Sequence, residues 1–286
     1  MRRAFKILPP LYIFLIVMSL AMLAFGVFPG RMILASVFFV SNYLPNPNAV
    51  GIFLGHTWSL AIEEHFYLIL PLLLLFLTKK NKSPHPFRWL PLICLSVGLL
   101  CFVSRWMEPS RWSETHLRMD GLFAGATLRY MERYRAHWFR YFQNPAALLM
   151  GLTFWILPYT VTTWGPLLRT ASYTWTVLSA SALVGWCFSH DSARCWKSLP
   201  FRTLASIGLA SYSMYLWQEP FSFIGLSPRL GYKLIGFVLC VAAGKIMAAL
   251  IEFPSLKWRD RFLSRSVRTD SPPMYSAEAL PAHIQS

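Results

Sequence analysis

The stretch WSLAIEEHFYLILPLLLLFL, residues 58–77, joins an apolar run of membrane-spanning length to two adjacent carboxylates, Glu63 and Glu64. A bilayer core of about 30 Å requires about 20 mostly apolar residues in one helix. Charged side chains within such a helix are costly and usually face a cavity, a partner or a substrate pathway. This stretch therefore predicts a membrane span that carries either a functional site or a helix-packing ion pair.

Similar apolar runs recur along the chain and predict an all-α protein, a polytopic transmembrane helix bundle of about eight spans. The other predicted spans are 7–28, 89–103, 121–134, 145–161, 166–188, 201–224 and 232–253. The run 32–40 is too short to cross a bilayer and is predicted to be a short helix at the outer face. We expect one transmembrane domain over 1–257, followed at 258–286 by a tail that is first basic and then disordered.

The composition supports a membrane location and argues against a nucleic-acid partner. Hydrophobic residues make up 55% and charged residues 14% of the 286, whereas soluble proteins have about 25% charged residues. Most of the 27 lysines and arginines that give the net charge of +15 fall in cytoplasmic segments if the N-terminus is inside. This asymmetry predicts a multi-pass protein with both ends in the cytoplasm.

The five cysteines form no C-x-x-C pair, so no metal site or disulfide is expected.

The helical period places the two carboxylates of the first stretch on different faces. Glu63 and Tyr67 are four residues apart and share one face, while Glu64 lies beside it. One carboxylate could line a cavity while the other anchors a neighbouring helix. Glu63 is therefore either functional, as a general base or a charge partner in a polar cleft, or a member of an ion pair that fixes helix packing. Glu64 is the better candidate for the ion pair that fixes helix packing.

Two further clusters carry polar or aromatic side chains at predicted membrane depth. Arg118 and Asp120 lie where a span enters from the outer face. They either form part of a site, or Asp120 is there because the helix dipole stabilises a carboxylate at a helix N-terminus. Tyr215 and Trp217 lie near an outer end, where they could stack on a sugar or belong to the interfacial aromatic belt. Glu252 ends the last span and is expected to pair with the basic residues that follow it in the sequence.

These clusters, in this order, resemble the acyltransferase-3 family of bacterial membrane O-acyltransferases, which acylate lipopolysaccharide, peptidoglycan and other surface glycans. The residues that carry the resemblance are WSLAIEEHFY at 58–67, RMD at 118–120 with Gly125, SYSMYLW at 211–217, IEFP at 251–254 and RAFKILP at 3–9. Lys6 stands where the family has a second arginine, and Gln218 where many members have histidine. In the family, two further spans, one with a histidine proposed to be catalytic, precede the segment at which this chain begins.

The resemblance implies a reaction and a role for each cluster. Acyl-CoA is the expected co-substrate, with no tightly bound cofactor, and its phosphates would dock on Arg3 and Lys6 at the cytoplasmic face. The acyl group, expected to be acetyl, would pass through the bundle to a carbohydrate hydroxyl at the outer side of the bacterial inner membrane.

In this chain Glu63 or His65 would have to supply the base, and Glu64 is expected among the catalytic residues. Arg118 and Asp120 would organise the outer mouth. Trp58, Tyr67, Tyr215 and Trp217 are the expected substrate contacts. The alternatives are an inactive, truncated remnant that binds glycans or assembles with a partner, and a small-solute transporter.

Overall fold

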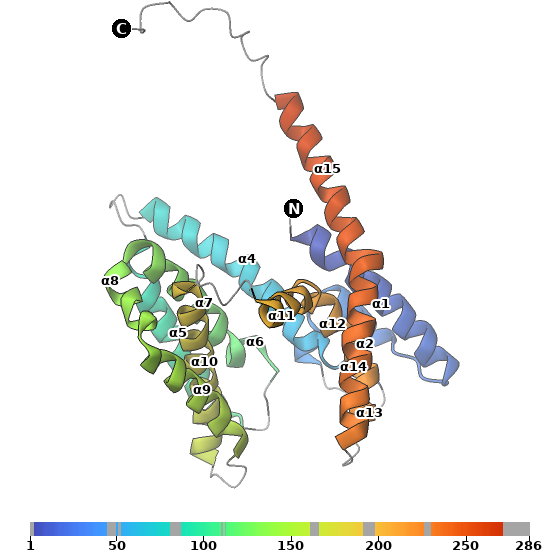
Figure 1. Cartoon of the computed structure of the whole chain (residues 1–286), viewed down its shortest axis with the longest axis horizontal. Helices are drawn as coiled ribbons and strands as arrows, with labels where there is room; N and C mark the ends of the chain where they lie inside the picture. The colour runs from blue at the N-terminus through green and yellow to red at the C-terminus, as the bar shows by residue number, and fades with distance from the viewer. Residues whose placement is uncertain are drawn as a thin grey trace, which may run out of the picture. The chain divides into compact units, whose positions relative to one another are not determined.

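The computed structural model describes residues 3–44, 50, 53–80, 87–109, 111, 113–160, 166–190, 198–225 and 230–270. These residues form helices, turns and loops, and none of those described lies in a strand (Figure 1). The chain divides into two compact units. We call Met18–Ser206 the central unit, and Met1–Val17 together with Ile207–Ser286 the terminal unit.

Four helical segments in the described part of the chain are long and apolar enough to cross a membrane. They are α1 (Ala4–Ala24), α4 (Thr57–Lys80), α5 (Leu90–Met107) and the stretch Leu230–Phe262. The predicted all-α membrane fold is thus confirmed. The helices α7 (Asp120–Tyr134) and α9 (Pro145–Thr160), both predicted to span, have only 15 and 16 residues.

The central unit is built around α4, α5, α7 and the long helix α10 (Pro166–Ser189). Its shorter elements are α2 (Gly30–Val37), η1 (Ser41–Tyr43), α6 (Thr115–Arg118), α8 (Ala136–Phe139) and η2 (Arg140–Gln143). Helix α10 lies along α9 and also packs on α5 and α7, while α6 contacts both α4 and α5. The expected short helix within 32–40 corresponds to α2, which buries Met32 and Ala35 and exposes Leu34.

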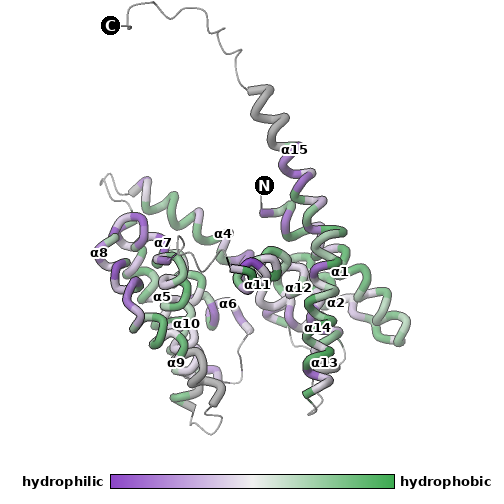
Figure 2. The backbone as a smooth tube through the Cα atoms, viewed as in Figure 1, coloured by the Kyte–Doolittle hydropathy of each residue, from purple (hydrophilic) through white to green (hydrophobic). Residues whose placement is uncertain are grey.

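The terminal unit joins the first turns of α1 to helices from the other end of the chain. These are α12 (Ser211–Trp217), α13 (Glu219–Gly225), α14 (Leu230–Met247) and α15 (Phe253–Asp270), with a π-helical segment, η4 (Ala248–Glu252), between the last two. Helix α11 (Leu199–Leu209) leads into this unit. Figure 2 shows hydrophobic residues along α14 and hydrophilic ones along α15.

The predicted single span 201–224 is divided in the structure into α11, α12 and α13. Helix α12 ends at Trp217 because Pro220 has no N–H, and its ring would clash with the carbonyl of Leu216 if that helix continued. Pro220 is accommodated instead in the first turn of α13. Residues 258–270 of the predicted tail continue the helix α15, and the remainder lies outside the described residues.

Helices α12 and α14 approach each other closely at Gly244. A Cβ atom there would lie 2.6 Å from the Cα atom of Met214, so a larger residue must displace backbone. We expect Gly244→Ala to lower the free energy of unfolding by about 1–3 kcal/mol, the usual effect of overpacking. The control is Gly231→Ala on the same helix, because nothing lies within 4 Å of its added Cβ. Equal melting temperatures of the two variants in detergent would show that this approach is not tight.

Candidate active site

A buried ion pair holds together three helices of the central unit. Arg105, from the last turn of α5, is 3% exposed, and its Nη2 atom lies 2.9 Å from Oδ2 of Asp120 at the start of α7. The same guanidinium donates hydrogen bonds to the carbonyl of Leu117 at 2.8 Å and to Oγ1 of Thr174 at 2.9 Å. These further hydrogen bonds offset part of the cost of removing the buried pair from water. This pair therefore fixes α5, the α6–α7 junction and α10 relative to one another.

A second guanidinium, that of Arg118, lies on aromatic faces next to this pair. Its Cζ atom is 4.0 Å from the ring centroid of Tyr173 and 5.6 Å from that of Trp58. Arg105 is 5.7 Å from the Tyr173 ring. Cations near aromatic faces are stabilised by the ring quadrupole. The cluster joins α4, α6 and α10, and it brings two guanidinium groups and the carboxylate of Asp120 together with the rings of Trp58 and Tyr173.

The predicted carboxylates on α4 differ in their exposure, as the helical period requires. Glu63 is exposed and Glu64 is half-buried. The next residue, His65, has its Nδ1 atom 2.7 Å from Oγ1 of Thr115, which also accepts a hydrogen bond from Nδ2 of Asn42 at 2.8 Å. These contacts tie α4 to α6, the helix that carries Arg118 at its end.

A buried carboxylate organises the terminal unit. Glu252, fully buried in the π-helical segment η4, accepts a hydrogen bond from Oγ of Ser213 at 2.7 Å, and its Oε1 atom lies 3.7 Å from Nζ of Lys6. The hydroxyl of Tyr212 donates to the carbonyl of Ile7 at 2.9 Å. Segments at 3–9, 211–217 and 251–254 therefore meet around one carboxylate. π-Helical turns occur frequently at functional sites.

The predicted site residues are distributed between the two units. The central unit contains Trp58, Glu63, Glu64, Tyr67, Arg118 and Asp120, whereas the terminal unit contains Arg3, Lys6, Tyr215 and Trp217. Within the first set, Trp58 lies against Arg118. Within the second, Trp217 is 6% exposed and packs edge-on against Phe14 at 5.4 Å, while Tyr215 is half-buried.

In the described residues, no group of three or more His, Cys, Asp or Glu side chains could hold a metal ion.

Sequence reasoning missed Arg105 and Tyr173 as members of the cluster. Arg105 belongs to none of the motifs that indicated candidate site residues. It stands in the last turn of an apolar helix, where a long charged side chain usually reaches the membrane interface, so its position in the sequence did not mark it as buried. Tyr173 belongs to no motif, so its contacts with the two guanidinium groups could be found only from the packing of α10.

The fold and these charged clusters define a helical membrane protein that holds arginine and carboxylate side chains in its interior. The chain belongs to the acyltransferase-3 family, because the sequence model of this acyltransferase domain matches residues 1–253.

Named relatives are O-acetyltransferases. Peptidoglycan O-acetyltransferase OatA of Listeria monocytogenes is 28% identical over 77% of this chain and 39% of its own length. O-acetyltransferase OatA of Staphylococcus aureus is 28% identical over 65% of this chain and 34% of its own length. A further S. aureus protein with a provisional O-acetyltransferase name is 26% identical over 93% of this chain and 50% of its own length. The chain thus spans half or less of the relatives' length. No solved structure matches it.

Proposed function

We propose that this chain acts as a membrane O-acyltransferase, moving an acyl group, expected to be acetyl, from cytoplasmic acyl-CoA to a carbohydrate hydroxyl. The observation that carries the proposal is the family match over residues 1–253, together with relatives named as O-acetyltransferases. Because the Listeria relative is named for peptidoglycan, a cell-surface or periplasmic glycan is the proposed acceptor. The proposed location is the bacterial inner membrane, with both chain ends in the cytoplasm.

The proposed docking site for the acyl donor is the basic face of the terminal unit. The side chain of Lys6 is 46% exposed although its ammonium lies near Glu252, so it can still meet a ligand. Arg3 precedes it, and α15 adds Lys257 and Arg259 to the same unit. CoA carries several phosphates, and arginine and lysine are the side chains that bind phosphate best.

The proposed reaction assigns separate tasks to the residues of the central unit. The Glu63 carboxylate would take the proton of the acceptor hydroxyl as its oxygen bonds to the thioester carbon. The guanidinium of Arg118, oriented by Tyr173 and Trp58, would stabilise the resulting oxyanion. Collapse of this intermediate breaks the carbon–sulfur bond, and the thiolate of CoA leaves and is protonated.

Other residues would support this chemistry without touching the reacting atoms. Asp120 would set the position of Arg118 through its contact with Arg105, and Glu64 would hold α4 in place. Tyr67, which is 40% exposed, and Trp58 offer rings on which a sugar could stack. Tyr215 and Trp217 are the proposed substrate contacts in the terminal unit.

The test is an acyl-transfer assay with the full chain in lipid nanodiscs, isotope-labelled acetyl-CoA and a peptidoglycan-derived oligosaccharide. We expect a base-labile acetyl ester on the sugar, detected by mass spectrometry. Arg3→Gln should raise the KM for acetyl-CoA about tenfold with kcat retained, as expected for the loss of one charge-assisted phosphate contact. Arg202→Gln, an exposed arginine on α11, is the control. Absence of ester on this and other surface glycans would overturn the proposal.

A further inference from the structure

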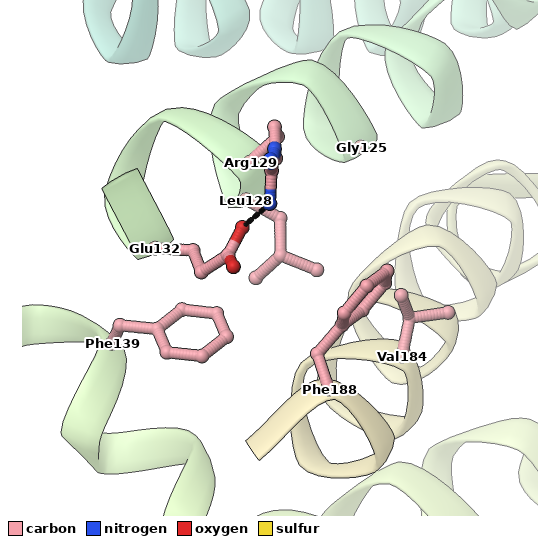
Figure 3. Close-up of a pocket in the computed structure, with 7 residues that line it drawn as sticks. All are labelled: Gly125, Leu128, Arg129, Glu132, Phe139, Val184 and Phe188. Carbon is pink, nitrogen blue, oxygen red and sulfur yellow. Dashed lines mark hydrogen bonds and ion pairs between the residues drawn. The ribbon is translucent and has the colours of Figure 1, made fainter. Parts of the chain in front are cut away.

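An apolar cavity lies in the central unit beside α7, α8 and α10. It has a volume of about 280 Å³ and is lined by Leu128 of α7, Phe139 of α8, and Val184 and Phe188 of α10 (Figure 3). The side chains of Arg129 and Glu132, which pair with each other, stand at its edge. Val184 and Phe188 remain 45% and 57% exposed, so the cavity is open on the side of α10.

A second hollow extends this cavity along the same two helices. Its volume is about 220 Å³, it shares Gly125, Leu128 and Val184 with the first, and it reaches Gly121. Together the two form a groove from Gly121 to Glu132, which at 1.5 Å per residue is about 16 Å long. This length is about half of a bilayer core, the depth of a single leaflet. We call this feature the α7–α10 groove.

The wide end of the α7–α10 groove is surrounded by positive charge. Arg129, Arg133, Arg135 and Arg140 are exposed in the last turns of α7 and in the segment that follows, with Glu132 as the acidic residue among them. Figure 2 shows a hydrophilic stretch where α7 turns into α8. Exposed aromatic rings lie in the same segment: Tyr134, Trp138 and Tyr141. Arginines beside tyrosine and tryptophan are typical of a membrane–water interface that faces anionic lipid.

We propose that the α7–α10 groove binds one acyl chain of an anionic phospholipid, with the headgroup phosphate held by Arg133 and Arg140. Both arginines are sequence neighbours of residues that line the cavity, Glu132 and Phe139. The open side of the groove lets a chain enter from the bilayer, and the charge at its mouth selects an acidic headgroup. The residues proposed to hold the lipid differ from those of the proposed donor and acceptor sites, so the inference does not depend on the proposed function.

Photo-cross-linking of the full chain in nanodiscs tests the site. Phosphatidylglycerol or phosphatidylcholine, each with a diazirine near the middle of one acyl chain, is added at equal amounts to the same neutral bilayer. We expect phosphatidylglycerol to label peptides that contain Leu128, Val184 or Phe188 several-fold more than phosphatidylcholine does. Gly125→Leu should abolish this labelling, because a Cβ at Gly125 meets nothing within 4 Å and the leucine fills the groove.

Matched variants test separately the binding of the acyl chain in the groove and the binding of the headgroup phosphate by the arginines. Gly98→Leu on α5, where an added Cβ is equally unobstructed, should leave labelling intact. The double variant Arg133→Gln, Arg140→Gln should remove the preference for phosphatidylglycerol, whereas Arg31→Gln, an exposed arginine on α2, should retain it. Because Arg133 and Arg140 are exposed, the double variant should fold, and it tests the headgroup site even if Gly125→Leu does not fold.

Three results would overturn the inference. One is equal labelling by the two lipids in the unmodified chain. Another is labelling that persists in folded Gly125→Leu. The third is loss of labelling when palmitoyl-CoA is added at the concentration of the lipid probe. Such competition would assign the groove to an acyl donor.

Discussion

Replacement of Glu63 by glutamine should lower the rate of acyl transfer by about two to four orders of magnitude, the usual contribution of a general base. The amide has nearly the same shape but cannot take the hydroxyl proton. Since the side chain is exposed, the substitution should cost little stability. We therefore expect normal membrane insertion and an unchanged melting temperature, with the loss confined to kcat/KM in the nanodisc assay.

Glu108→Gln is the matched control for this prediction. Glu108 is 41% exposed, pairs with Arg111 at 2.7 Å in the loop after α5, and has no proposed role in the reaction. Acyl transfer at the unmodified rate in Glu63→Gln, with Glu108→Gln also active, would remove Glu63 from the site. His65, held by Thr115 on the neighbouring helix, would then be the next base to test.

Replacement of Asp120 by asparagine should destabilise the central unit by about 3–5 kcal/mol, because it leaves the buried guanidinium of Arg105 without its counter-charge. Arg105 and Asp120 are 3% and 5% exposed, so water cannot replace the lost partner. The measurement is the midpoint of thermal unfolding in detergent, followed by size-exclusion chromatography. Asp260→Asn provides the comparison, since Asp260 is 66% exposed beside Arg259 and should contribute at most about 1 kcal/mol.

A double substitution separates stability from function at this pair. Arg105→Met with Asp120→Leu replaces two buried charges by apolar side chains and should recover most of the stability lost in Asp120→Asn. If Asp120 positions Arg118 through Arg105, the double variant should fold and still transfer acyl groups poorly. Full activity in the folded double variant would show that the pair serves packing alone.

The sequence was sufficient to predict the helical membrane fold, because a run of apolar residues can satisfy its backbone within a bilayer only as a helix or a closed barrel. It predicted α1, α4, α5 and α14 close to their observed bounds. It failed at 201–224, where hydropathy continues through Pro220, a residue that disfavours an unbroken helix, and the structure has three separate helices. Hydropathy measures transfer to lipid and does not register a missing backbone donor.

The candidate site was only partly predictable, because sequence motifs identify residues but do not identify their interaction partners. Motifs identified Arg118, Asp120 and Glu252 as polar residues in apolar surroundings, but nothing in a motif specifies a partner. The pairing of Asp120 with Arg105, and of Glu252 with Ser213 and Lys6, depends on helix packing over long sequence separations. Such contacts become visible only when the helices are placed in space.

The terminal unit joins residues that the ribosome makes at very different times. Oγ of Ser255 donates to the carbonyl of Phe5 at 2.7 Å, and the ring of Trp258 packs on that of Phe5 at 5.4 Å. At about 5–20 residues per second, roughly 250 residues take from about 12 s to about 50 s to synthesise. Helix α1 must therefore wait in the membrane while the central unit is made, and it acquires these partners last. During that interval its partner-facing side is available to chaperones, lipids and other membrane helices.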